Sequence, residues 1–136
     1  MRFDLSNRTE LARRVLVLLA ADSDQTLKGA DLAEAVGTTR HYLPQVMRPL
    51  VAAGWVDSDP GPTGGYRLLD GIDGVSVWDL VMAVERSVDD GRCVLTGEWC
   101  NDDRRCSIHD AWKKARAVLQ KELERTPAIP RGRGWQ

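Results

Sequence analysis

The order of elements predicted along these 136 residues is helix, turn, helix and hairpin, which is typical of a winged helix-turn-helix domain. Two amphipathic segments, at 29–36 and 40–53, are separated by a glycine and indicate the paired helices. Strand-forming residues at 55–58 and 66–69 flank a loop rich in Pro and Gly, which indicates a two-stranded wing. A long apolar stripe that begins near residue 108 predicts a further helix. We therefore expect a mainly α fold with a small β-hairpin wing, followed by a long C-terminal dimerisation helix.

Polar residues and a glycine mark the ends of the predicted helices. Asn7 stands three residues before Glu10, which is the spacing of a capping box, and the apolar periodicity that follows predicts a first helix over 7–21. Gly37 stops the second helix, and the two threonines after it offer hydroxyl caps for the third. Ser76 is placed to cap a fourth helix.

Two prolines interrupt the third predicted helix. Pro44 falls in its first turns, where a missing backbone N–H costs little. Pro49 lies further inside and predicts a kink or a loosened turn. The docking geometry of this helix therefore depends on how the chain accommodates Pro49.

The C-terminal helix is preceded by a second capping-box pattern, Ser107 with Asp110. Its apolar face needs a partner, which is either a second copy of the chain, giving a homodimer, or the first helix of the same chain. The segment from Thr126 has helix breakers and no periodicity, so we expect little order there. The apolar stripe comprises Ile108, Ala111, Trp112, Ala115, Val118, Leu119 and Leu123.

Composition excludes few classes of partner. The net charge of −1 argues against a protein that coats polyanions indiscriminately, although a basic patch can coexist with a neutral total. No apolar run is long enough to span a bilayer, and the N-terminus lacks the apolar stretch of a signal peptide, so we expect a cytoplasmic protein with no membrane contact. In a reducing compartment, three clustered cysteines fit a metal or redox role better than a disulfide framework.

The predicted helix-turn-helix and wing indicate binding to double-stranded DNA, because the second helix of this motif enters the major groove. Arg40 and Arg48 are suited to guanine or phosphate, and the Gln45 amide is suited to adenine. Each of these residues alone also fits an ordinary solvated helix face, but the set favours DNA. The candidate contacts on the motif, the wing and the N-terminus are Arg2, Lys28, Thr38, Thr39, Arg40, His41, Tyr42, Gln45, Arg48, Thr63 and Gly64.

The three cysteines of the chain, Cys93, Cys100 and Cys106, lie in one polar loop, and His109 follows three residues after the last. Thiolates bind soft metals well, and gaps of six and five residues favour an iron–sulfur cluster over a zinc site, which usually has C-x-x-C steps. Zinc and redox-active thiols remain alternatives. His109 is the candidate fourth ligand, because a helix N-terminus disfavours the charged imidazolium, and Glu10 is the weaker alternative.

These features divide the chain into three predicted parts. Residues 1–75 form the winged helix-turn-helix DNA-binding domain. Residues 76–125 contain the cluster-binding loop and the dimerisation helix, and residues 126–136 form a flexible tail. No catalytic constellation stands out, so we expect a protein that is not an enzyme.

Four short segments and the cysteine loop resemble the Rrf-two family of bacterial transcription regulators, over about residues 2–125. The segments are Asp31-Leu-Ala-Glu, Tyr42-Leu43, Leu50-Val-Ala-Ala-Gly-Trp-Val56 and Gly64-Gly-Tyr-Arg-Leu68. The resemblance implies a dimeric winged-helix repressor or activator whose three cysteines bind an iron–sulfur cluster. It also implies two options for the fourth ligand: His109 completing a [2Fe-2S] site, or Glu10 reaching across the dimer to a [4Fe-4S] cluster.

The resulting hypothesis is a homodimeric transcription regulator that senses redox, nitric oxide or iron status through its cluster. Pro60 and Pro44 replace residues that similar regulators use on the wing and on the recognition helix, so a known operator sequence does not transfer to this chain. The alternatives are a zinc-stapled or thiol-based regulator of the same fold, and a winged-helix module that binds another protein through Trp55 and Trp78.

Overall fold

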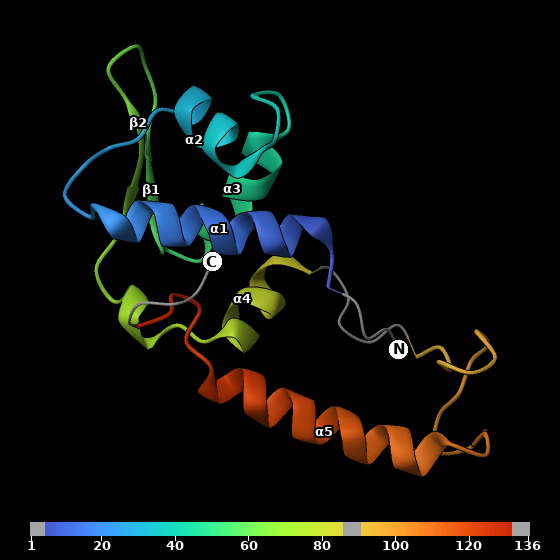
Figure 1. The fold of residues 1–136 in the computed structure, drawn as a ribbon. Helices are drawn as coiled ribbons and strands as arrows, with labels where there is room; N and C mark the ends of the chain where they lie inside the picture. Colours follow the sequence, from blue (N-terminus) through green and yellow to red (C-terminus); the bar gives the residue numbers. More distant parts are fainter. Residues whose placement is uncertain (1–4, 86–90, 132–136) are drawn as a thin grey trace.

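The computed structural model describes residues 5–85 and 91–131. Its elements in chain order are α1 (Asn7–Ala21), α2 (Gly29–Val36), α3 (Leu43–Ala52), β1 (Val56–Asp59), β2 (Gly65–Leu68), the 3-10 turn η1 (Ile72–Gly74), α4 (Val77–Val84) and α5 (His109–Arg125). Figure 1 shows α1 across the middle of the molecule, with α2, α3 and the hairpin on one side and α4 and α5 on the other. The predicted winged helix-turn-helix with a long C-terminal helix is confirmed.

The hydrophobic core is built around α1, which contacts α2, α3, α4 and β2. Leu16 and Leu19 of α1 have no exposed surface, and neither do Val46 and Leu50 of α3 or Leu80 of α4. Burying one such side chain contributes about 1.5–3 kcal/mol. Because α1 packs on both sides, it holds the helix-turn-helix and α4 in one body.

The first helix has the predicted bounds but a different cap. Ser6, and not Asn7, is the N-cap, and its Oγ accepts the N–H of Thr9 at 3.3 Å. Glu10 lies in the first turn and binds Arg13 instead of closing a capping box. The prediction erred by one residue because Asn and Ser are both good caps and stand side by side here.

Two other helix ends follow the sequence signals. Gly37 ends α2 with φ of 76°, a left-handed conformation that glycine adopts without steric cost. Ser76 caps α4 by accepting the N–H of Asp79 at 3.0 Å, and the Asp79 carboxylate accepts the N–H of Ser76 at 2.9 Å. These two predictions are confirmed.

Helix α3 runs without interruption through Pro49. Pro44 lies in its first turn, as expected, and the Thr39 Oγ1 accepts the N–H of Tyr42 at 3.0 Å just before the helix begins. The missing proline N–H leaves the carbonyl of Gln45 without its helical donor, but Gln45 is exposed, so solvent can bind it. The helix therefore continues past Pro49, and the kink or loosened turn expected there stays a prediction.

The wing is a two-stranded antiparallel sheet in which Asp59 stands opposite Gly65. Leu27 extends the sheet by one rung, because its N–H donates to the Tyr66 carbonyl at 2.9 Å and its carbonyl accepts the Tyr66 N–H at 2.8 Å. These bonds tie the wing to the segment that enters α2. The wing is therefore joined to the helix-turn-helix by hydrogen bonds as well as by the chain itself.

The boundaries of the parts differ from those predicted. Leu80 and Val84 of α4 lie in the core of the head, so the head continues past residue 75. Ala128 is 1% exposed and its N–H donates to the Val75 carbonyl at 2.9 Å, so the chain is held beyond residue 126 instead of starting a flexible tail there. The rest of the predicted tail, 132–136, lies outside the described residues.

Helix α5 packs on α4 and, among the described residues, buries none of its own side chains fully. Its predicted Ser107–Asp110 cap is wrong: Ile108 is the N-cap, and the Asp110 carboxylate instead binds Arg105 at 3.1 Å. Val118 is 60% exposed, so the apolar stripe is left open on a single chain. Within the described residues, no helix combines the length and the apolarity needed to cross a bilayer.

Candidate metal centre and nucleic-acid interface

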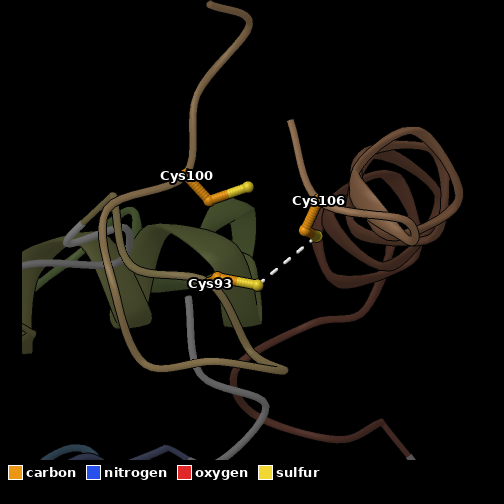
Figure 2. A group of neighbouring side chains, drawn as sticks. All are labelled: Cys93, Cys100 and Cys106. Atoms are coloured by element: carbon orange, nitrogen blue, oxygen red, sulfur yellow. Dashed lines mark hydrogen bonds between the residues drawn. The ribbon is translucent and has the colours of Figure 1, made fainter. Parts of the chain in front are cut away.

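The three cysteine sulfurs converge on one point beside the start of α5. Their Sγ atoms all lie within 4.8 Å of one another, and those of Cys93 and Cys106 are 3.4 Å apart. Figure 2 shows the side chains of Cys93 and Cys100 pointing from the loop toward Cys106, next to α5. Cys93 and Cys106, which are thirteen positions apart in the sequence, thus belong to one group of three neighbouring thiols.

A short turn brings the first two cysteines together. The Cys93 N–H donates to the Glu98 carbonyl at 2.7 Å, and the Cys100 N–H donates to the Gly91 carbonyl at 3.0 Å. The Trp99 ring covers Gly91 so closely that a Cβ there would lie 2.6 Å from a ring carbon. A glycine is therefore needed at this position, and the loop has a defined shape although it contains no helix or strand.

The environment favours the thiolate form of Cys93. Hydrogen bonds from the N–H and hydroxyl of Thr96, with smaller help from the Leu95 N–H and Cys106, lower the pKa of Cys93 to about 6. For Cys106, the Ile108 N–H lowers the pKa, but contact with Cys93, burial and Cys100 together raise it. One sulfur of the pair therefore carries the charge first, and a thiolate is the form that binds a metal.

His109 lies at the edge of the cysteine triad. Its Nδ1 is 3.1 Å from the Cys100 Sγ, and its Nε2 is 3.1 Å from the Asp102 Oδ1. Sequence reasoning missed Asp102, whose only signal was a carboxylate inside the loop between two candidate ligands. The structure thus brings His109 to the cysteines and adds a carboxylate behind it.

Glu10 does not lie with the cysteines of its own chain. It is exposed and forms two hydrogen bonds of 2.9 Å with Arg13, which lower its pKa. The group of described side chains close enough to share an ion comprises the three cysteines. A role for Glu10 would require the second chain of a dimer.

A cavity of about 260 Å³ opens beside the sulfurs, and its lining includes the apolar Ile108 and Trp112 and the cationic Arg92, Lys113 and Arg116. Cationic side chains there suit an anionic group bound to thiolates. A single tetrahedral ion with metal–sulfur bonds of about 2.3 Å needs sulfurs roughly 3.8 Å apart, which the triad already approaches. A group with more than one iron needs wider spacing between some of the sulfurs. The thiol and imidazole donors and the cationic lining therefore suit either group chemically, and the present sulfur spacing is closer to that of a single ion.

Five of the predicted DNA contacts, Lys28, Arg40, Gln45, Arg48 and Gly64, line two grooves of the head. Lys28 and Arg40 line a groove of about 540 Å³ between the start of α2, the start of α3 and the wing. Gln45 and Arg48 line a second groove of about 360 Å³, together with Arg8. The sequence carries no signal for Arg8 as a DNA contact, because an arginine in the first turn of a helix is common on protein surfaces.

Several predicted contacts have structural roles as well. Thr39 is exposed and caps the turn before α3, whereas Tyr42 is half-buried and packs on the core. Gly64 is buried, and a Cβ there would lie 1.9 Å from the Asp59 carbonyl oxygen, so this glycine is required by the wing itself. His41 and Thr63 are exposed and Thr38 is half-buried, while Arg2 lies outside the described residues.

A family model described as an iron-dependent transcriptional regulator, Rrf2, matches residues 5–127. The chain belongs to the Rrf2 family. The Rrf2 match spans the head, the cysteine loop and α5, so the resemblance drawn from the sequence is confirmed over nearly the whole chain.

Individual Rrf2 relatives agree with this assignment. The HTH-type transcriptional regulator IscR of Vibrio campbellii is 37% identical over 84 residues, which cover 62% of this chain and 49% of that protein. This chain therefore spans about half the length of the IscR relatives it matches.

Solved Rrf2 structures share the fold. CymR of Staphylococcus aureus has a TM-score of 0.70 and 22% identity, covering 90% of this chain and 93% of that one. IscR of T. potens has a TM-score of 0.67 and 21% identity, covering 93% of this chain and 83% of that one. At these identities the likeness extends to the fold alone.

Proposed function

We propose that this Rrf2 protein is a cytoplasmic, homodimeric DNA-binding transcription regulator that senses redox, nitric oxide or iron status through an iron–sulfur cluster. The observation that carries this proposal is the convergence of three thiols and His109 at the start of α5. The family description as iron-dependent and the IscR relatives support the same conclusion. Cys93, Cys100 and Cys106 would hold the cluster, with His109 as the fourth ligand.

When bound, the cluster supplies a centre that changes with oxidation, nitrosylation or loss of iron. The protein's part is to connect that centre to the head. Cys93 follows α4 and Cys106 precedes α5, so binding at all three sulfurs ties these two helices together. Loss of the cluster would remove this link between α4 and α5, and a resulting shift of α5 would change the spacing of the two recognition helices in a dimer.

The open apolar stripe of α5 supports the homodimer. Val118 and Leu119 are 60% and 37% exposed in a single chain, and they lie on the side of the helix that α4 does not bury. A second copy that pairs along this stripe removes both side chains from water. Helix pairing of this kind places two DNA-binding heads at a fixed separation, as palindromic half-sites require.

The two basic grooves support DNA binding by the head. Arg40 and Lys28 flank the wing groove, where phosphates are the expected ligands, and Gln45 and Arg48 lie on the exposed side of α3. Arg8 adds a cation that the sequence had not suggested, beside Gln45. Arg40, Gln45 and Arg48 come from α3 and the residues just before it, so this segment supplies cations or an amide to both grooves.

Anaerobic purification followed by an absorption spectrum and by iron and sulfide assays tests the cluster. We expect a coloured protein with iron and sulfide in equal amounts, and loss of both when any one of the three cysteines is replaced by Ser. A colourless protein with stoichiometric zinc would contradict the cluster assignment. Binding of the loaded and metal-free dimer to the DNA upstream of its own gene, over a range of salt concentrations, tests the regulator.

The second candidate is a zinc-stapled or thiol-based regulator of the same fold. It is favoured by the tight sulfur spacing, which suits one tetrahedral ion, and by the 3.4 Å contact between Cys93 and Cys106. A protein-interaction module is less well supported, because Trp55 is partly buried against the core and Trp78 is half-buried. Salt-dependent DNA binding separates the regulators from that module.

A further inference from the structure

Asp102 lies at the centre of a small polar network behind the cysteine site. Its Oδ1 is 3.1 Å from the Nε2 of His109 and 3.1 Å from the Nζ of Lys113. Its Oδ2 is 3.2 Å from the same Nζ, and Arg105 Nη2 lies 3.7 Å from Oδ1. Two cations therefore hold this carboxylate in place while it faces the imidazole.

The contact decides which nitrogen of His109 carries a proton. A carboxylate between two cations is ionised and accepts hydrogen bonds without donating any. The Nε2 of His109 must therefore donate to Asp102, which leaves the lone pair of a neutral ring on Nδ1. That atom is 3.1 Å from the Cys100 Sγ, on the side where the three sulfurs converge.

We propose that Asp102 is a positioning residue that orients His109 and makes its Nδ1 the metal-binding atom. This inference rests on the proposed metal-binding role of the cysteine site. It adds the choice of nitrogen and the residue responsible for that choice. Carboxylates behind metal-bound histidines fix the ring in this way, and their loss typically weakens metal binding about 10- to 100-fold.

The neighbouring residue Asp103 provides a matched control. Asp103 is also an exposed loop carboxylate, and its backbone N–H donates to the Asn101 Oδ1 at 3.0 Å. Asp103→Ala therefore removes the same charge from the same loop without touching His109. Asp102→Glu keeps the carboxylate and serves as the rescue variant.

The first experiment measures the His109 tautomer in the metal-free full-length chain. The protein contains two histidines, so the ring ¹⁵N signals recorded at mildly alkaline pH come from His109 and the exposed His41 alone. We expect His109 to carry its proton on Nε2 with a long-lived hydrogen bond, and this signature to disappear in Asp102→Ala but not in Asp103→Ala. A proton on Nδ1, or an unchanged His109 signal in Asp102→Ala, would overturn the inference.

The second experiment titrates Co²⁺ into the metal-free protein and follows its visible absorption. Asp102→Ala should weaken Co²⁺ binding about 10- to 100-fold, Asp102→Glu should restore part of it, and Asp103→Ala should leave it unchanged. In a His109→Ala background, Asp102→Ala should cause no further loss. A loss of equal size in that background would show that Asp102 does not act through His109.

The two experiments separate this inference from the proposed function. If the wild-type protein binds neither Co²⁺ nor a cluster, the proposed metal site fails, while the tautomer measurement still decides whether Asp102 orients His109. If metal binds and Asp102→Ala has no effect on tautomer or affinity, the site stands and the role of Asp102 is wrong.

Discussion

The carboxylate of Glu85, at the end of α4, accepts the backbone N–H of Ser6 at 2.8 Å, at the start of α1. The same carboxylate binds the hydroxyl of Thr9, and Arg8 donates to the Val84 carbonyl at 2.6 Å. The end of the helix that leads into the cysteine loop is thus fastened to the first turn of the DNA-binding head. This junction therefore connects the C-terminal end of α4 to Arg8.

Removing this junction should destabilise the head. Glu85→Ala leaves the Ser6 N–H and the Thr9 hydroxyl without their acceptor, so we expect a loss of about 1–3 kcal/mol in the free energy of unfolding, measured by denaturant titration. Glu34→Ala removes an exposed carboxylate of α2 and should change stability by less than about 0.5 kcal/mol. Equal losses in both variants would contradict the junction's role.

The same junction predicts a pH dependence. Burial raises the pKa of Glu85, but hydrogen bonds from Thr9 and Ser6 and the charge of Arg8 outweigh it, so the pKa lies below its ordinary value of 4.5. Because the folded pKa is depressed, the stabilisation is present above pH 4.5 and is lost as pH falls through the folded pKa. The stability difference between wild type and Glu85→Gln should therefore shrink below pH 4.5, and a difference that grows there would count against it.

Oxidation of the metal-free protein should join Cys93 to Cys106. Their sulfurs are 3.4 Å apart, whereas the Cys100 sulfur faces His109. With diamide as oxidant, the two thiols lose two hydrogens to the N=N bond, giving one disulfide and a hydrazine. Peptide mapping by mass spectrometry should find this pair in wild type and in Cys100→Ser. A disulfide that mainly involves Cys100 would refute the pairing.

The wing should not tolerate a side chain at Gly64. A Cβ there would lie 1.9 Å from the Asp59 carbonyl oxygen, so Gly64→Ala should open the hairpin, lower stability by at least about 1 kcal/mol and weaken DNA binding. At Gly74 a Cβ meets nothing within 4 Å, so Gly74→Ala is the matched control and should leave both properties near wild type. Thermal unfolding and fluorescence anisotropy with DNA measure the two effects.

The dimer should depend on the apolar stripe of α5. Val118→Glu places a carboxylate on that stripe and should shift the protein to a monomer in analytical ultracentrifugation, with little change in the fold because Val118 is exposed in the single chain. Ala117→Glu adds the same charge one residue away, off the stripe, and should leave a dimer. If the wild-type protein is itself a monomer, the proposed dimer and this prediction are both wrong.

The DNA contacts should separate into two kinds. Arg40→Ala, in the wing groove, should reduce the salt slope of binding by about one, as loss of one phosphate contact does. Gln45→Ala should leave that slope unchanged and relax the preference at one base pair by about 1–3 kcal/mol. Arg125→Ala, at the far end of α5, is the control for general charge loss. Identical effects of Arg40→Ala and Gln45→Ala would contradict this division.

Much of the fold followed from local sequence signals. The bounds of α1 and α2, the left-handed stop at Gly37 and the Ser76 cap depend on neighbours within four residues, so periodicity and capping rules were enough to predict them. The Ser107–Asp110 cap does not form, and the Asp110 carboxylate instead binds Arg105, five residues before it. Capping rules consider only the residues of the first helical turn, so they do not predict when a side chain outside it, such as Arg105, binds the capping carboxylate instead.

Contacts between distant parts of the chain were decided only by the tertiary structure. The sequence alone determined the helix-turn-helix order, the three cysteines as donors and His109 as their neighbour, because residue type and spacing carry that information. The packing of α4 into the head, the anchoring of Ala128 and the carboxylate of Asp102 behind His109 depend on folding. Such contacts arise because burying apolar surface brings together polar groups that no spacing rule relates, and those groups then determine which atom of the site is free to bind.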